Sequence, residues 1–146
     1  RPRLDLNLKI PEMIGNLEPF AGLSAEDLER VSRLFRPQLA LPGEFIIRKG
    51  DRSKRVFFIS SGAVEVRLPN QTIRRGRGEF FGELAVLFGQ RRVADIVALG
   101  YCELLILDQA KFNTFLKVNP AIRQHIEEVA QIRWASLSHA LEAAAS

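Results

Sequence analysis

The segment from 38 to 107 constrains the fold of this chain most, because short apolar runs rich in Val, Ile and Phe alternate there with turn residues. Breaks between the runs fall at Pro42-Gly43, Gly50-Asp51, Ser61-Gly62, Pro69-Asn70 and 76 to 78. Apolar runs too short for helices are typical of strands, and Gly and Pro supply the backbone conformations of tight turns. The pattern predicts many short strands folded into a sandwich or roll.

Helical patterns flank this segment. On the N-terminal side, Ser24 followed by Asp27 resembles a capping box, and apolar residues then recur at helical spacing as Leu28, Val31, Leu34 and Phe35. We therefore expect a helical N-terminal segment over 12–36, with a short amphipathic helix that ends near Arg36.

On the C-terminal side, Asp108 can cap a helix over 108–118, and Asn119-Pro120 can serve as N-cap and first residue of a last helix over 120–142. No internal repeat or second-domain boundary interrupts the sequence. Residues 1–146 are therefore predicted to form one domain, with the β-roll over 37–107 between the helical parts.

The stretch from 82 to 95 joins a glycine turn with a carboxylate, a short apolar helical run and paired arginines. After Gly82, unpaired backbone N–H groups at the start of a short helix would attract an anion. Arg92 can reach the same anion with a bidentate fork, whereas Glu83 can accept hydrogen bonds only from hydroxyl groups. A phosphate beside vicinal hydroxyls indicates a nucleotide.

This stretch resembles the phosphate-binding cassette of cyclic nucleotide-binding domains. The matching residues are Phe81, Gly82, Glu83, Leu84, Ala85, Leu87, Arg92 and Ala94, and the stretches 41–44, 50–51, 57–59 and 62–66 resemble upstream landmarks of the family. The resemblance implies an α+β fold. It consists of an eight-stranded antiparallel β-roll, jelly-roll-like, with N-terminal helices, a short cassette helix and two C-terminal helices, the last a lid.

The resemblance also implies a site for cAMP or cGMP without any further cofactor. The phosphate would lie on the turn formed by Gly82, Glu83, Leu84 and Ala85, with Arg92 and Val93 beside it. Glu83 would hold the ribose 2′-hydroxyl, and the base would lie between Val66 and the final helix.

Arg133 interrupts an apolar stripe on the final helix, formed by Ile122, Ile126, Val129, Ala130, Leu137 and Leu141. A charge on a buried stripe needs a partner. The resemblance to bacterial potassium-channel members implies that Arg133 contacts the base, but its stem can equally cover apolar surface while the charge reaches water. The adjacent Trp134 can cover a purine face or serve in packing.

Asp95 departs from the family pattern, since it stands where many members carry Thr or Ser. At ~4 Å and an effective dielectric of about 20, two like charges repel by about 4 kcal/mol. Three arrangements remain open. Asp95 turns away and pairs with Arg91 or Arg74, it accepts a hydrogen bond from a purine amine, or the pocket binds cyclic nucleotide weakly or not at all.

Several classes of function find no support in the residues. No Ser, Cys or His arrangement suggests a nucleophile, and neither His125 nor His139 lies in a cluster with metal-ligand spacing, so we expect neither an enzyme nor a metal site. The single Cys102 allows no internal disulfide, which fits a reducing compartment. The net charge of +4 invites nucleic-acid binding, but the basic clusters lack interleaved aromatics and a recognition helix, so we expect no nucleic acid.

We expect a cytoplasmic cyclic nucleotide sensor whose lid helix closes on the ligand. The resemblance is strongest to domains of bacterial potassium channels, through 80–83 after Pro69-Asn70, and of cation/proton antiporters, through 94–102. Because the chain starts with Arg1, we expect a fragment that follows a transmembrane channel or transporter domain of the same chain. That places it at the cytoplasmic face of the bacterial inner membrane, in a homo-oligomer formed through the full-length protein. The alternatives are a cyclic nucleotide-dependent transcription regulator and an interaction module that no longer binds nucleotide.

Overall fold

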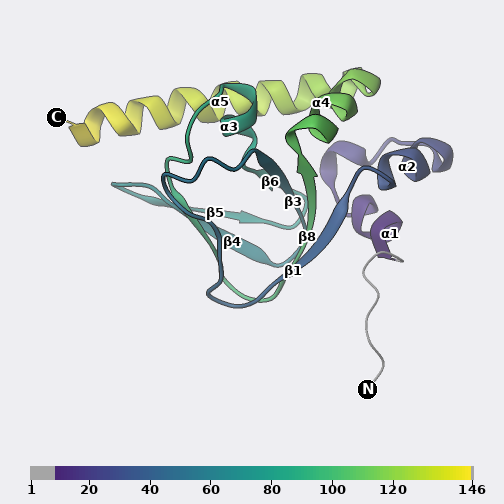
Figure 1. Cartoon of the computed structure of the whole chain (residues 1–146), viewed down its shortest axis with the longest axis horizontal. Coiled ribbons are helices and arrows are strands. Elements are labelled where there is room, and N and C mark those ends of the chain that lie inside the picture. Colours follow the sequence, from purple (N-terminus) through teal and green to yellow (C-terminus); the bar gives the residue numbers. More distant parts are fainter. Residues whose placement is uncertain (1–8, 146) are drawn as a thin grey trace.

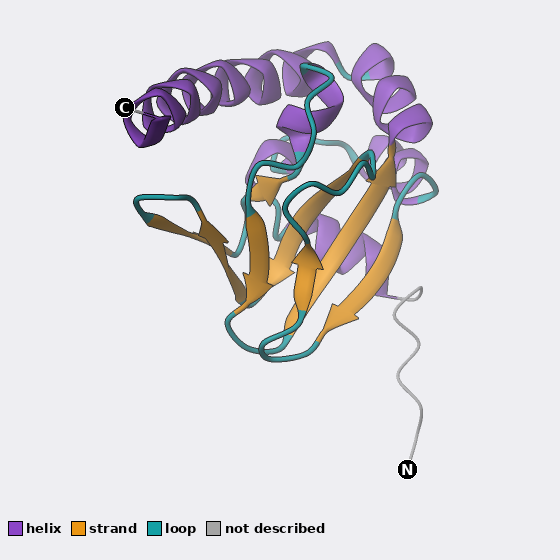
Figure 2. Cartoon of the chain, turned by 60° about the vertical axis from the view of Figure 1, so that its left-hand side comes forward, coloured by secondary structure: helices purple, strands orange, loops and turns teal. Residues whose placement is uncertain are grey.

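Two four-stranded antiparallel sheets form the centre of the protein, whose computed structural model describes residues 9–145. The strand orders are β1-β8-β3-β6 and β2-β7-β4-β5, and Figure 2 shows the two sheets folded against each other. The strands are β1 (Arg36–Ala40), β2 (Phe45–Ile47), β3 (Arg55–Ser61), β4 (Ala63–Arg67), β5 (Thr72–Gly76), β6 (Phe80–Phe81), β7 (Asp95–Ala98) and β8 (Cys102–Asp108). The predicted eight-stranded antiparallel roll is confirmed, and it starts and ends one residue outside the predicted range.

The strand β3 separates two hydrophobic cores. Phe57 and Ile59 point into the roll, where they pack with the inner faces of both sheets. Val56 and Phe58 point to the opposite side, where helices cover the sheet. Because β3 is buried on both faces, its sequence is a continuous apolar run instead of the alternation of a half-buried strand.

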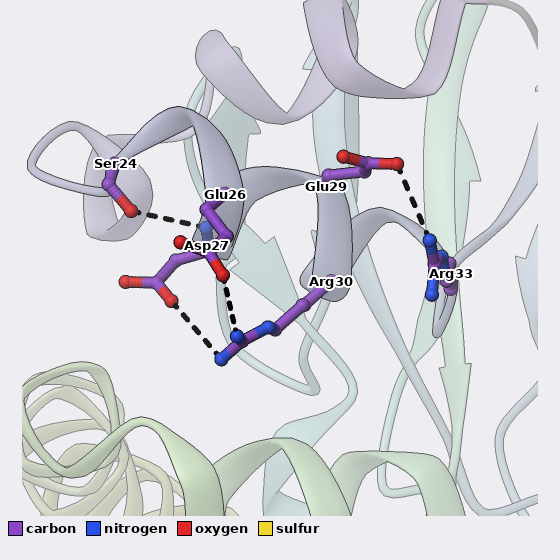
Figure 3. A network of polar contacts seen from close by, with 6 residues as sticks. All are labelled: Ser24, Glu26, Asp27, Glu29, Arg30 and Arg33. Atoms are coloured by element: carbon purple, nitrogen blue, oxygen red, sulfur yellow. Dashed lines mark hydrogen bonds and ion pairs between the residues drawn. The ribbon is translucent and has the colours of Figure 1, made fainter.

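The N-terminal helices α1 (Ile10–Gly15), η2 (Glu18–Phe20) and α2 (Ala25–Ser32) pack on that outer face. The predicted cap of α2 is confirmed, since the Ser24 hydroxyl accepts a hydrogen bond of 3.1 Å from the Asp27 N–H (Figure 3). Exposed Glu26–Arg30 and Glu29–Arg33 pairs follow on the same helix.

The predicted end of this helix near Arg36 is wrong. The helix ends at Ser32, and Arg36 instead begins β1, where it pairs with Ile106 of β8. Two effects favour the strand. Pro37 disfavours helical conformation at the residue before it, and sheet pairing supplies the backbone hydrogen bonds.

Three further helices complete the fold: α3 (Glu83–Leu87), α4 (Gln109–Val118) and α5 (Pro120–Ala145). Asp108 caps α4 as predicted, by accepting a 2.9 Å bond from the Lys111 N–H. The amide of Asn119 instead donates to the Phe115 carbonyl oxygen and so closes the end of α4. In Figure 1, α5 runs across the roll with α3 directly beneath it, an arrangement that places the long helix over the cassette.

Candidate functional site

A cavity of about 420 Å³ lies between the inner face of β4 and β5, the segment that begins with α3, and α5. Eight of the nine predicted site residues line it: Val66, Gly82, Glu83, Leu84, Ala85, Arg92, Val93 and Arg133. These residues come from four separate parts of the chain, so the fold itself brings them together. The ninth, Asp95, is not part of the lining.

Gly82 is required by the backbone at the start of α3. Its φ angle is +88°, in the left-handed region that favours glycine. A Cβ atom at this position would lie 2.8 Å from the Arg55 carbonyl oxygen and 3.2 Å from Nη1 of Arg92. The turn therefore accepts no side chain, and no side-chain hydrogen bond caps the N-terminus of the five-residue helix α3.

Arg92 is buried beside this turn, with 5% of its surface exposed. Nη1 donates to the Gly82 carbonyl oxygen at 2.7 Å, and Nη2 donates to the Arg55 carbonyl oxygen at 2.6 Å. The fork that was expected to bind the anion therefore holds the loop in place instead. Its Nε is buried and has no hydrogen-bond partner in the described part of the chain. A buried donor without a partner costs about 1–3 kcal/mol, which an acceptor on a ligand would recover.

The Gly50-Asp51 loop fixes the backbone of Arg92 from the other side. The Arg92 N–H donates to the Asp51 carbonyl oxygen at 3.1 Å, and the Gly50 N–H donates to the Arg92 carbonyl oxygen at 2.7 Å. Burial lowers the pKa of Arg92 and the nearby Asp51 charge opposes that shift. The guanidinium remains charged in either case, because an arginine in a protein is effectively always protonated.

Glu83 and Arg133 join the cassette to α5. Nη1 of Arg133 donates to Oε1 of Glu83 at 2.9 Å and to the Phe80 carbonyl oxygen at 2.7 Å. The Arg133 Cζ atom also lies 4.6 Å from the centre of the Phe80 ring. The expectation that Arg133 needs a partner is confirmed, and the partner is the carboxylate that was expected to hold the ribose.

The Glu83 carboxyl is almost completely buried, with 2% of its surface exposed. Burial raises its pKa above the ordinary value, and the attraction of Arg133 and then of Arg75 opposes this rise only in part. The carboxyl is therefore held in the protein at a cost in free energy, between two arginines that line the same cavity.

The carboxylate of Asp95 turns away from the cavity. Oδ1 accepts a hydrogen bond of 2.8 Å from the Lys49 N–H, so it pairs with backbone instead of with Arg91 or Arg74. Trp134 lines the cavity, and its ring also lies 5.3 Å from that of Phe88, between their centres. It thus combines the two roles considered for it, packing and covering the cavity.

Several residues on the sheet side line the cavity without having been predicted, among them Ile73, Arg75 and Glu79. A signal for two of them was present. Residues two apart in a strand share a face, so the apolar Ile73 marks the inner face of β5 and places Arg75 on it. Glu79 lies in the turn after β5, where no periodicity applies.

We also searched residues 9–145 for metal-binding clusters, a reactive cysteine and membrane-spanning helices. No group of three or more His, Cys, Asp or Glu side chains there could hold a metal ion. Cys102 is buried, and burial raises the pKa of its thiol, which makes it a poor nucleophile. No helix within the same residues has both the length and the apolar composition needed to cross a bilayer.

Known proteins are similar to this chain in sequence. The sequence model of the family described as "Cyclic nucleotide-binding domain" matches residues 38–119. A cyclic nucleotide-gated potassium channel of Rhizobium etli is 31% identical over 119 residues, which are 82% of this chain and 34% of the channel. The human potassium/sodium hyperpolarization-activated cyclic nucleotide-gated channel 4 is 30% identical over 126 residues, 86% of this chain and 10% of that channel.

The fold is also found in solved structures. The crystal structure of the Thermus thermophilus catabolite activator protein superposes with a TM-score of 0.70 and 25% identity, over 85% of this chain and 61% of that one. The family resemblance and the fold predicted from the sequence are both confirmed. The chain spans about a third or less of the two channels, so their whole activities do not transfer to it directly.

Proposed function

Because the chain belongs to the cyclic nucleotide-binding domain family, we propose that it is a sensor that binds cAMP or cGMP in the cavity beneath α5. The observation that carries this proposal is the buried Nε of Arg92, a charged donor without a partner at the wall of a cavity. A phosphate oxygen supplies the acceptor that this donor lacks, and a charge-assisted hydrogen bond is about twice as strong as a neutral one.

Different lining residues bind the phosphate, the ribose and the base. The turn from Gly82 to Ala85 and Arg92 hold the phosphate, and Glu83 accepts a hydrogen bond from a ribose hydroxyl. The base lies between Val66 and α5, against Arg133. Since Glu83 already binds Arg133, the ribose and α5 meet at one carboxylate, and this couples ligand binding to the position of the helix.

The output is the closure of α5 over the ligand. Moving such a helix from 1:99 to 99:1 closed requires a ligand that favours the closed state by about 5.5 kcal/mol. The attached effector is a membrane ion channel or cation transporter, at whose cytoplasmic face this non-enzymatic domain lies. The names of the channel relatives support this assignment.

A transcription regulator is the second candidate, favoured by the structural match to the catabolite activator protein. In that case a DNA-binding domain beyond this segment would receive the signal. An interaction module without nucleotide binding is the third candidate, and the presence of Asp95 in the cassette sequence is the argument for it. The hydrogen bond of Asp95 to the Lys49 N–H weakens that argument, because it directs the carboxylate away from the cavity.

Calorimetric titration with cAMP and cGMP tests the proposal. We expect binding at micromolar concentrations, and we expect Arg92→Lys to weaken it at least tenfold, because lysine keeps the charge but lacks the Nε donor and the two Nη donors that hold the loop. A hydrogen bond to a charged group is worth about 1.5–3 kcal/mol, which corresponds to this loss. The matched control is Arg52→Lys, at an exposed arginine outside the lining.

Thermal unfolding of each variant confirms that it is folded before it is titrated. If the folded wild-type protein bound neither nucleotide, the sensor proposal would be refuted and the interaction module favoured. Equal affinities of wild type and Arg92→Lys would remove Arg92 from the phosphate site.

A further inference from the structure

Strand register places one arginine on the base side of the cavity. In the β4–β5 ladder, Val64 pairs with Arg75 and Val66 pairs with Ile73. Directly paired residues share a face of the sheet, and Val64 is fully buried inside the roll. Arg75 therefore points inward beside Ile73 and Val66, whereas the intervening Arg74 points outward and is exposed.

The guanidinium of Arg75 has N–H donors that make no hydrogen bond among the described residues. Among the described residues it forms one ion pair, with Glu79 at 3.7 Å, and no hydrogen bond within 3.5 Å. Only 23% of its side chain is exposed. Burial lowers its pKa and the nearby Arg133 lowers it further, whereas Glu79 and Glu83 oppose this. A desolvated cation with unfilled N–H groups gains most from a ligand atom that accepts hydrogen bonds.

The neighbouring charged side chains Arg133, Glu83 and Glu79 already make hydrogen bonds within the protein. Nη1 of Arg133 holds Glu83 and the Phe80 carbonyl oxygen. Oε1 of Glu79 accepts a 2.8 Å bond from the Gly76 N–H, and its Oε2 faces Arg75. Arg75 is thus the charged side chain of this group that makes no hydrogen bond among the described residues, and all of its N–H donors are available to a base.

The two purines present different edges to such a donor. Guanine offers two adjacent acceptors, O6 and N7, which a guanidinium binds with both arms of its fork. Adenine offers the acceptor N7 beside the donor N6–H₂, so one arm of the fork would meet a second donor. The adenine edge is matched instead by the amide of Gln or Asn.

We propose, resting on the cyclic nucleotide site above, that Arg75 reads the O6/N7 edge of the base and makes this cavity favour cGMP over cAMP. A bidentate contact of this kind discriminates by about tenfold or more. Gln90, a lining residue whose amide suits adenine, does not compete at this edge. It is exposed after α3, on the Arg92 side of the cavity, and its amide donates to the Phe88 carbonyl oxygen.

Calorimetric titration of the folded wild-type chain with cGMP, cIMP and cAMP at one ionic strength is the first arm of the test. Cyclic IMP carries O6 and N7 but no amine at C2, so it isolates the edge assigned to Arg75. We expect cGMP and cIMP to bind with similar affinity and both to bind at least tenfold more tightly than cAMP. This arm needs no variant.

The second arm titrates Arg75→Gln, with Arg74→Gln on the outer face of the same strand as the matched control. We expect Arg75→Gln to move the cGMP-to-cAMP affinity ratio at least tenfold toward cAMP, and Arg74→Gln to leave it unchanged. A purely structural role of the Arg75–Glu79 pair would instead lower both affinities by the same factor.

The outcomes separate the two proposals. If the wild type binds cAMP as tightly as cGMP, or if Arg75→Gln leaves the ratio unchanged, the base assignment is overturned while the sensor function stands. If cGMP alone binds tightly and cIMP does not, the amine at C2 is read and Arg75 is not the selecting residue. If the wild type binds none of the three, the proposed function fails and this inference fails with it.

Discussion

At the scale of single residues, Glu83 is a site residue whose burial lowers the stability of the folded protein. Its carboxyl is buried, and burial raises its pKa despite a 2.9 Å contact with Arg133. Removing a charge from water costs several kcal/mol, and a single ion pair rarely repays all of it. The carboxylate is suited to accept a strong hydrogen bond from a ribose hydroxyl.

This cost predicts a pH dependence of stability. The folded-state pKa of Glu83 lies above its ordinary value of 4.5, so between that value and the raised pKa the folded protein binds more protons than the unfolded chain. The contribution of Glu83 to stability is therefore fully present below pH 4.5 and is lost as the pH rises through the folded pKa.

We expect the free energy of unfolding of the wild type, relative to that of Glu83→Gln, to fall as the pH rises from 4.5 toward neutrality. Urea unfolding at a series of pH values measures it. The variant supplies the baseline for all other titrating groups, because glutamine does not titrate. A difference that rises with pH, or stays constant, would contradict the assigned direction.

At the scale of elements, the two halves of α5 have different roles. Its first half carries Ile122 and Ile126, which are buried in the core formed with the N-terminal helices and α4. Its second half carries Arg133, Trp134 and Leu137, which line the cavity. The helix is thus anchored at one end and covers the ligand site with the other, as a lid requires.

This division predicts that two alanine substitutions separate stability from binding. Ile126→Ala, at a fully buried core residue, should lower the free energy of unfolding by about 2–5 kcal/mol and leave the affinity of the folded protein for nucleotide nearly unchanged. Leu137→Ala should cost less stability but weaken nucleotide binding, because its side chain faces the cavity. Urea unfolding and calorimetry on both variants measure this, and equal losses of both properties in both variants would contradict it.

Local signals explain which elements could be predicted from the sequence. The cap at Ser24, the cap at Asp108 and the turn at Gly82 depend on residues within a few positions, so their chemistry is visible in a short window. Non-local pairing was not visible. Nothing in the sequence specifies that Lys49 would bind Asp95, 46 residues away, or that α5 would bring Arg133 to the cassette carboxylate.

The miss at Arg75 has a different cause. The five residues of β5 include only one aliphatic side chain, Ile73, so the inner face of the strand rests on a single residue. That single marker places Arg75 on the inner face, and the register with β4 confirms that Arg75 is inside and Arg74 outside. The cassette half of the site could therefore be predicted from its motif, together with Val66 and Arg133 on the base side, whereas Arg75 was recognised only from the fold.

At the scale of the whole molecule, the excess of positive charge acts on any anionic ligand. The chain has 21 Lys and Arg against 17 Asp and Glu, a net charge of +4 at pH 7. Arg75, Arg91, Arg92 and Arg133 all line the cavity. Such a field attracts a cyclic nucleotide, which carries one negative charge, and it is weakened by salt.

We expect both cAMP and cGMP to bind more weakly as NaCl is raised from about 0.05 M to about 0.5 M, since the Debye length falls below about 5 Å over that range. The factor should be the same for the two nucleotides, because they carry the same phosphate charge. Their affinity ratio should therefore stay constant, since base selection depends on short contacts inside the cavity. Guanosine, which lacks the phosphate, is the uncharged control and should show little salt dependence. If the ratio instead changed with salt, base selection would depend on the long-range field of the protein and not on the contact at Arg75.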